Sequence, residues 1–166
     1  MVAPDEARAG PARAFWAWRR LPQLLQSEVG ECGLACLAMI AGFWGHGVAI
    51  AELRRRHPAS LKGMTLQRLI EIAGTLGLRG RALRLEPAQL RNLQLPCILH
   101  WNMNHFVVLH RVRRNHVVIH DPAAGQRRVA RAGLSTAFTG IALELVPGAD
   151  FQPRREPPAA RLQALF

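Results

Sequence analysis

Cys32 stands where a polar loop meets an apolar run, a position that suits a nucleophile. The stretch "QSEVGECGLACLAMI", residues 26–40, places it in the predicted first turn of a helix. There the helix dipole and unpaired backbone N–H groups favour a thiolate, the form that attacks acyl carbons. Gln26 could join the backbone N–H of Cys32 as a second donor to a tetrahedral oxyanion. These residues alone fit equally well a small buried cysteine behind an ordinary loop glutamine.

A nucleophile of this kind needs a base, and the segment "HFVVLHRVRRNHVVIHD" offers His105 with Asp121. The segment reads as two valine-rich strands joined by a tight turn. Residues opposite each other in such a ladder have Cβ atoms about 5 Å apart. Asp121 would then fix the tautomer of the imidazole and stabilise its protonated form. A turn centred on Arg113 predicts these pairs: Val107 with Ile119, Leu109 with Val117, and His105 with Asp121.

The sequence has seven histidines, so most of them must have other roles. His100, separated from the hairpin by "WNMN", is the second choice for the base. His120 alternates away from the side of Asp121, which argues against it. His110 and His116 are expected to face each other on the side of the hairpin opposite His105.

Cys36 and Cys97 are expected to pack in the core. Cys36 lies one turn after Cys32 on a continuous apolar helix, whereas structural zinc sites use closely spaced pairs on knuckles. The sequence therefore predicts no metal ion and no cofactor. Three cysteines cannot all pair within one chain, and without an export signal free thiols in a reducing compartment are the simplest assignment.

Composition indicates a globular domain with a basic surface. The 166 residues are 49% hydrophobic and 20% charged, and the formal net charge is +11. Such charge suits acidic peptides, the anionic cytoplasmic leaflet or nucleic acid. Nucleic-acid binding is disfavoured because no aromatic residues alternate with the arginines and no binding motif is present. No apolar run is long enough to span a membrane.

The order of predicted elements favours an α+β fold. Helices come first, and an antiparallel sheet follows. Gly45 should end the buried helix, and Thr65 is a plausible N-cap for the third helix. The expected helices cover residues 33–44, 48–57, 64–78, 86–93 and 134–138. The expected strands cover residues 79–85, 96–101, 105–112, 116–121, 125–130 and 140–146.

These motifs together resemble one known family. Glutamine, then cysteine at a helix start, then histidine and an acid from a later sheet is the papain-like arrangement. More narrowly, "QSEVGECGLACLAM", "LPCILHWNMNHFVVLHRV", "HDPAAGQRRV" and "FTGIALELVPG" resemble, in order, motifs of the bacteriocin-processing peptidase domains of peptide-exporting ABC transporters. The similarity is greatest to colicin V-type exporters. It covers about residues 20–151 and implies a papain-like peptidase domain over 21–150. Residues 1–20 are rich in alanine, proline and arginine and are expected to be flexible, and the proline- and arginine-rich residues 151–166 are expected to be a linker toward a transmembrane domain.

The resemblance also implies roles and partners. Cys32 would be the nucleophile, His105 the general base and acid, Asp121 the orienting group and Gln26 the oxyanion donor. The substrate would be a leader peptide ending in a Gly-Gly type motif, cut at the cytoplasmic face of the plasma membrane during export. Transmembrane and nucleotide-binding domains of the exporter would be the partners. Two alternatives are a non-catalytic leader-binding module and another Cys-His-Asp acyl-transfer enzyme.

Overall fold

A computed structural model of the chain describes residues 19–58 and 60–155. The expected flexible segment 1–20 and linker 151–166 therefore lie largely outside the described residues. The expected α+β order is confirmed, because three helices precede a six-stranded sheet into which only short helices are inserted. The longest described helix has 13 residues, so no described helix is long enough to cross a bilayer.

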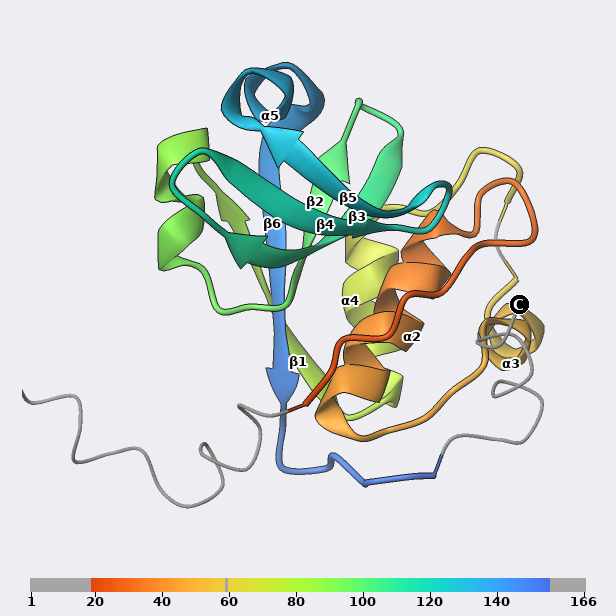
Figure 1. Cartoon of the computed structure of the whole chain (residues 1–166). Helices are drawn as coiled ribbons and strands as arrows, with labels where there is room; N and C mark the ends of the chain where they lie inside the picture. The colour runs from red at the N-terminus through yellow and green to blue at the C-terminus, as the bar shows by residue number, and fades with distance from the viewer. Residues whose placement is uncertain (1–18, 59, 156–166) are drawn as a thin grey trace, which may run out of the picture.

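One antiparallel sheet forms the centre of the domain (Figure 1). Its strand order is β1-β6-β2-β3-β4-β5, so β1 and β5 are the edge strands. Every neighbouring pair is antiparallel. The strands are β1 (Leu78–Arg84), β2 (Cys97–Trp101), β3 (His105–Val112), β4 (His116–Asp121), β5 (Gly125–Ala130) and β6 (Phe138–Pro147).

The helices lie on both faces of this sheet. The first three helices in the described residues are α2 (Cys32–Trp44), α3 (Ile50–Arg56) and α4 (Leu66–Thr75). The 3₁₀-helix η2 (Pro87–Asn92) and the helix α5 (Arg131–Ala137) occupy the insertions between strands. α2 contacts β3 and β6, and α4 contacts β1, so these helices cover one face of the sheet (Figure 1). η2 and α5 contribute to the apolar cluster on the other face.

α2 is buried along almost its whole length, as its apolar sequence predicts. Eleven of its 13 residues are buried, which matches a helix with no polar stripe. Gly45 ends it in the left-handed region at φ 99°, where a residue without Cβ is favoured. Thr65 caps α4 by accepting a hydrogen bond from the Arg68 N–H, as predicted. These local signals fix where the two helices begin and end.

The predicted register of the β3–β4 hairpin is wrong. Val108 pairs with His120 and Leu109 with Ile119, and the register then shifts by one between Leu109 and Arg111. Extending the observed pairing toward the open end places Val107, rather than His105, opposite Asp121. The cause is the position of the turn, because Val112 pairs with Val117 and the turn is therefore centred between Arg114 and Asn115 rather than on Arg113. The irregularity within β3 shifts the register back by only one residue.

Candidate active site

Cys32 is the first residue of α2 and lies in the wall of a cavity of about 760 Å³. Its residue exposure is 6%, so the thiol lies at the cavity rather than on an open surface. A backbone N–H in the first turn of a helix has no acceptor within that helix. The buried body of α2 therefore holds the sulfur firmly, while the helix start leaves donors directed toward the cavity.

His105 and Asp121 meet beside Cys32, although they are diagonal rather than opposite in the sheet. His105 Nε2 lies 2.7 Å from Asp121 Oδ1. Diagonal neighbours in a ladder remain within reach of long side chains. The Cys32 side chain lines the same cavity as the His105 ring and helps to raise the pKa of that ring. Because Nε2 is taken by the carboxylate, Nδ1 is the ring nitrogen left for the sulfur.

This arrangement favours an imidazolium at neutral pH. The hydrogen bond to Asp121, followed by the interaction with Cys32, raises the pKa of His105 to about 9. Burial raises the pKa of the Asp121 carboxyl, but its hydrogen bonds lower that pKa overall. Their donors are His105, the Ala123 N–H at 2.9 Å and Arg127 Nη1 at 3.3 Å. A charged carboxylate thus faces a charged imidazolium next to a thiol.

Gln26 lines the same cavity as Cys32, His105 and Asp121. Its backbone N–H donates to the Pro122 carbonyl at 2.8 Å, which ties the loop before α2 to the chain after β4. Its side-chain Nε2 donates to the Glu28 carbonyl at 3.2 Å. A primary amide has two N–H donors, so one remains for a ligand. The structure therefore brings all four predicted site residues to one cavity.

Glu31 is a functional residue whose part in this site the sequence did not reveal. It is 2% exposed and directly precedes Cys32. Its Oε2 accepts hydrogen bonds from the Ser27 N–H at 3.1 Å and the Glu28 N–H at 3.0 Å. Its Oε1 pairs with Arg54 Nε on α3. This buried carboxylate fixes the loop that carries Gln26. The acidic residue next to the cysteine was the only available signal.

The rival histidines have other surroundings. His100 lines the same cavity, but its Nδ1 lies 2.8 Å from Thr139 Oγ1 and no described carboxylate pairs with it. His120 Nδ1 donates to the Pro22 carbonyl at 2.9 Å. The predicted pair of His110 with His116 is wrong, because the bulge in β3 turns the His110 ring onto His120, with ring centroids 4.9 Å apart. His105 is thus the histidine that lies beside both the thiol and a carboxylate.

Cys36 and Cys97 pack in the core, as predicted. Both are fully buried. Burial raises the pKa of each thiol, and for Cys36 the neighbouring Cys32 and Asp121 raise it further. Both therefore stay protonated and are poor nucleophiles.

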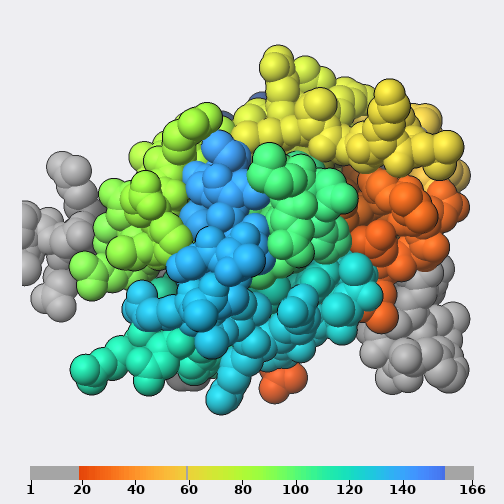
Figure 2. Space-filling view, turned by 90° about the horizontal axis from the view of Figure 1, so that it is seen from above, coloured from red at the N-terminus to blue at the C-terminus, as the bar shows by residue number. Residues whose placement is uncertain are grey.

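The rim of the cavity is built from segments far apart in the sequence. Figure 2 shows the loop before α2 in orange, residues near 60 in yellow, the β2–β3 turn in green and the β4–β5 turn in teal, all meeting on one face. Three exposed apolar side chains stand among them: Val29, Leu61 and Met103. Met103 is held at φ 66°, in the left-handed region that costs energy for residues other than glycine. Large apolar side chains left exposed around a cavity mark a binding surface.

The sequence is similar to parts of longer secretion and transport proteins. The colicin V secretion/processing ATP-binding protein CvaB of Escherichia coli is 52% identical over 134 residues, covering 81% of this chain and 19% of that protein. The lactococcin-G-processing and transport ATP-binding protein LagD of Lactococcus lactis is 30% identical over 139 residues, covering 80% of this chain and 20% of that protein. The chain thus spans about a fifth of the length of these relatives.

Solved structures share the fold. A double glycine motif protease from an AMS/PCAT transporter, solved with its leader peptide, overlaps with a TM-score of 0.73 at 34% identity, covering 78% of this chain and 93% of that one. The peptidase domain of Streptococcus ComA overlaps with a TM-score of 0.71 at 26% identity, covering 77% of this chain and 99% of that one. The expected papain-like α+β fold is therefore confirmed. The profile of the Peptidase C39 family matches residues 20–150, so this chain belongs to that family and is a cysteine peptidase domain.

Proposed function

We propose that Cys32 is the nucleophile that cuts a precursor peptide after a Gly-Gly type motif. The Cys32 thiolate attacks the carbonyl carbon of the second glycine while His105 holds its proton as an imidazolium. The backbone N–H of Cys32 and the free amide N–H of Gln26 donate to the resulting oxyanion. The observation that carries this proposal is the placement of one imidazole beside both the Cys32 thiol and the Asp121 carboxylate.

The rest of the cycle follows from the same groups. The imidazolium gives its proton to the leaving amine, the C–N bond breaks, and the leader remains as a thioester on Cys32. Neutral His105 then takes a proton from water, and the hydroxide attacks the thioester carbonyl. Collapse of the second tetrahedral species breaks the C–S bond and releases the leader carboxylate. Asp121 keeps the ring in one orientation throughout and stabilises its charged form.

The form of the cavity supports a leader peptide with small residues at its end. Glycines carry no side chains, so they can approach a thiol that is only 6% exposed in the cavity wall. A larger residue at either position would be rejected sterically. The exposed side chains of Val29, Leu61 and Met103 offer an apolar surface for the preceding part of the leader. The related protease solved with a leader peptide supports the same substrate class.

The setting of the reaction is also part of the proposal. The relatives are secretion, processing and transport proteins about five times as long as the matched region. We infer that this domain acts at the cytoplasmic face of the plasma membrane, beside transmembrane and nucleotide-binding domains of an exporter. Processing would then be coupled to export of the cargo peptide.

The test separates cleavage from binding. Cys32→Ala should abolish cleavage of a synthetic Gly-Gly precursor, measured by mass spectrometry. It should leave the Kd for that precursor within about threefold of the value for the unchanged protein, because the leader contacts do not involve the Cys32 sulfur. Cys36→Ala is the matched control and should keep cleavage within a similar margin. Binding without any cleavage by the unchanged protein would indicate a leader-binding module. Transfer of the acyl group to added amines in preference to water would indicate an acyl-transfer enzyme.

A further inference from the structure

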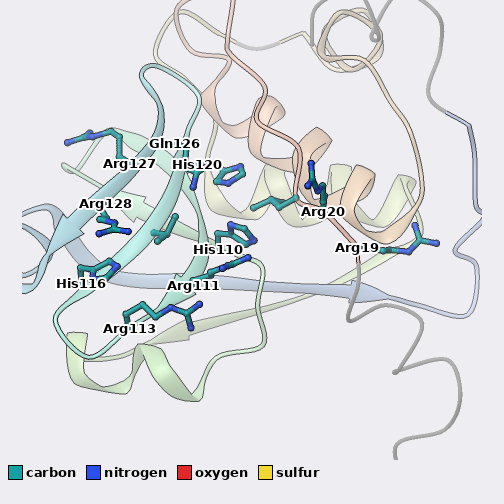
Figure 3. A pocket seen from close by; sticks show the side chains of 12 residues that line it. Arg19, Arg20, His110, Arg111, Arg113, His116, His120, Gln126, Arg127 and Arg128 are labelled. Atoms are coloured by element: carbon teal, nitrogen blue, oxygen red, sulfur yellow. The ribbon is translucent and has the colours of Figure 1, made fainter. Parts of the chain in front are cut away.

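A second cavity, of about 1140 Å³, opens on the sheet and borders the catalytic cavity at Arg127. It lies between residues 19–21 and the part of β3, β4 and β5 that α2 does not cover (Figure 3). Nine of its twelve lining residues are arginine or histidine, and none is acidic. Its arginines are Arg19, Arg20, Arg111, Arg113, Arg127 and Arg128. A concave wall of one sign of charge concentrates counter-ions.

Three of the arginines in this cavity are not paired with a carboxylate in the described part of the chain. Arg127 contacts Asp121 at 3.3 Å, at the border with the catalytic cavity. Arg111, Arg113 and Arg128 form no ion pair with any described residue. Confining like charges in a concave site costs free energy unless an anion neutralises them. Among the described residues, these three arginines therefore have no carboxylate partner, and an anion in the cavity could neutralise them.

Two imidazole rings line the cavity beside its arginines. His120 is 3% exposed, and its Nδ1 donates to the Pro22 carbonyl. Its Nε2 is buried and has no hydrogen-bond partner among the described residues, and neither has Nδ1 of the adjacent His110. Both rings line the cavity (Figure 3). An unsatisfied buried polar atom is costly and calls for a partner. Burial lowers the pKa of both rings, so they stay neutral and the six arginines supply the positive charge of the cavity.

The lining selects among the possible anions. Leu21 and Val118 are its only apolar residues, too few for the buried anchors that hold a peptide. No phenylalanine or tryptophan lines it, so unpaired bases would find no stacking platform. Guanidinium groups match phosphate oxygens with paired N–H donors. We propose that this cavity binds a compact, multiply charged phosphate group, such as a diphosphate or triphosphate.

The test uses tripolyphosphate and isothermal titration calorimetry on the whole 166-residue chain, with no peptide substrate present. Its outcome is therefore independent of the proposed catalytic function. The chain should bind about one tripolyphosphate, and Arg111→Gln with Arg128→Gln should weaken binding by about tenfold or more, since each removes charge-assisted hydrogen bonds. Both arginines are exposed, so the variant should fold. Arg127 is left unchanged because it also borders the catalytic cavity.

The control removes the same charge at the other edge of the sheet. Arg79→Gln with Arg84→Gln changes two exposed arginines of β1 and should alter binding by less than about threefold. Equal weakening by both double variants would mean diffuse attraction to a basic protein and would overturn the proposal. Absence of binding by the unchanged chain, or tighter binding of a glutamate-rich peptide than of tripolyphosphate, would overturn it as well.

A second arm distinguishes the source of the phosphate. Vesicles of phosphatidylcholine with a polyphosphorylated lipid would compete with tripolyphosphate if the cavity accepts a head group at a membrane surface. Binding of tripolyphosphate alone would assign a soluble ligand. Either result supports a phosphate site, provided that the Arg111 and Arg128 double variant loses the binding and the β1 control keeps it.

Discussion

Replacing Asp121 with asparagine should move the alkaline limit of activity to lower pH. The catalytic form proposed here needs a protonated His105 next to the Cys32 thiolate. The hydrogen bond that His105 donates to Asp121 is the main reason why the pKa of His105 rises from 6.5 to about 9. An asparagine oxygen can still accept from Nε2, so the ring can keep its place, but the negative charge is gone. The pKa of His105 should then fall.

The size of the effect can be estimated from these values. With a pKa of about 9, roughly nine-tenths of His105 is protonated at pH 8, and with a value near 6.5 only about 3% would be. Cys32 also raises the pKa of His105, so in Asp121→Asn that pKa should lie between 6.5 and about 9. Asp121→Asn should therefore reduce the imidazolium population by about 3-fold to 30-fold at pH 8, and by less than about 1.5-fold at pH 6.

The assay is kcat/KM for a Gly-Gly precursor between pH 6 and 10, for the unchanged protein and for Asp121→Asn. NMR titration of the His105 ring gives the same pKa without turnover. Asp150→Asn, a matched change at an exposed aspartate, should leave both profiles in place. If Asp121→Asn lowers kcat/KM by one factor at every pH, and the His105 titration does not move, Asp121 acts only on the fold and our reasoning about the charge is refuted.

Three further predictions concern stability, measured by chemical denaturation. A methyl group at Gly33 would lie 2.7 Å from a buried leucine side chain, so Gly33→Ala should lower the free energy of unfolding by about 1–3 kcal/mol. The control is Gly74→Ala, which has open space around the new methyl group and should raise the free energy of unfolding by up to about 1 kcal/mol. Glu31→Gln removes a buried ion pair and should cost about 1–3 kcal/mol, against less than about 0.5 kcal/mol for the exposed Glu28→Gln. The raised pKa of His105 stabilises the fold fully below about pH 6.5 and less as the pH rises through about 9, so the stability advantage over His105→Gln should shrink over that interval.

Much of the fold could be predicted from local patterns, but the exact register of the hairpin could not. The start of α2, its end at Gly45 and the contact of His105 with Asp121 follow from apolar periodicity, a helix-ending glycine and strands flanking a turn. The hairpin register failed because the turn is centred between Arg114 and Asn115 rather than on Arg113, which displaces every pair of the hairpin. The contact survived this error because side chains two residues out of register still meet diagonally.

The buried role of Glu31 and the cationic cavity could not be read from the sequence, because each depends on partners far along the chain. The carboxylate of Glu31 is paired by Arg54, 23 residues later. The cavity joins residues 19–21 to strands about 90 to 107 residues further on. A local pattern can indicate that a residue is polar or buried. Only the packing of α3, the N-terminal segment and the sheet edge decides which charges become neighbours.

The ends of regular elements explain how one site can be both firm and accessible. Cys32 begins α2, His105 begins β3 and Asp121 ends β4, so each side chain is carried by an element whose body is buried. Residues within those bodies would be covered by packing, and residues on free loops would not keep a 2.7 Å contact between ring and carboxylate. Gln26 is the member carried by a loop, and that loop is the one fixed by the buried carboxylate of Glu31. The same requirement for rigidity thus accounts for the acidic residue that stands directly before the nucleophile.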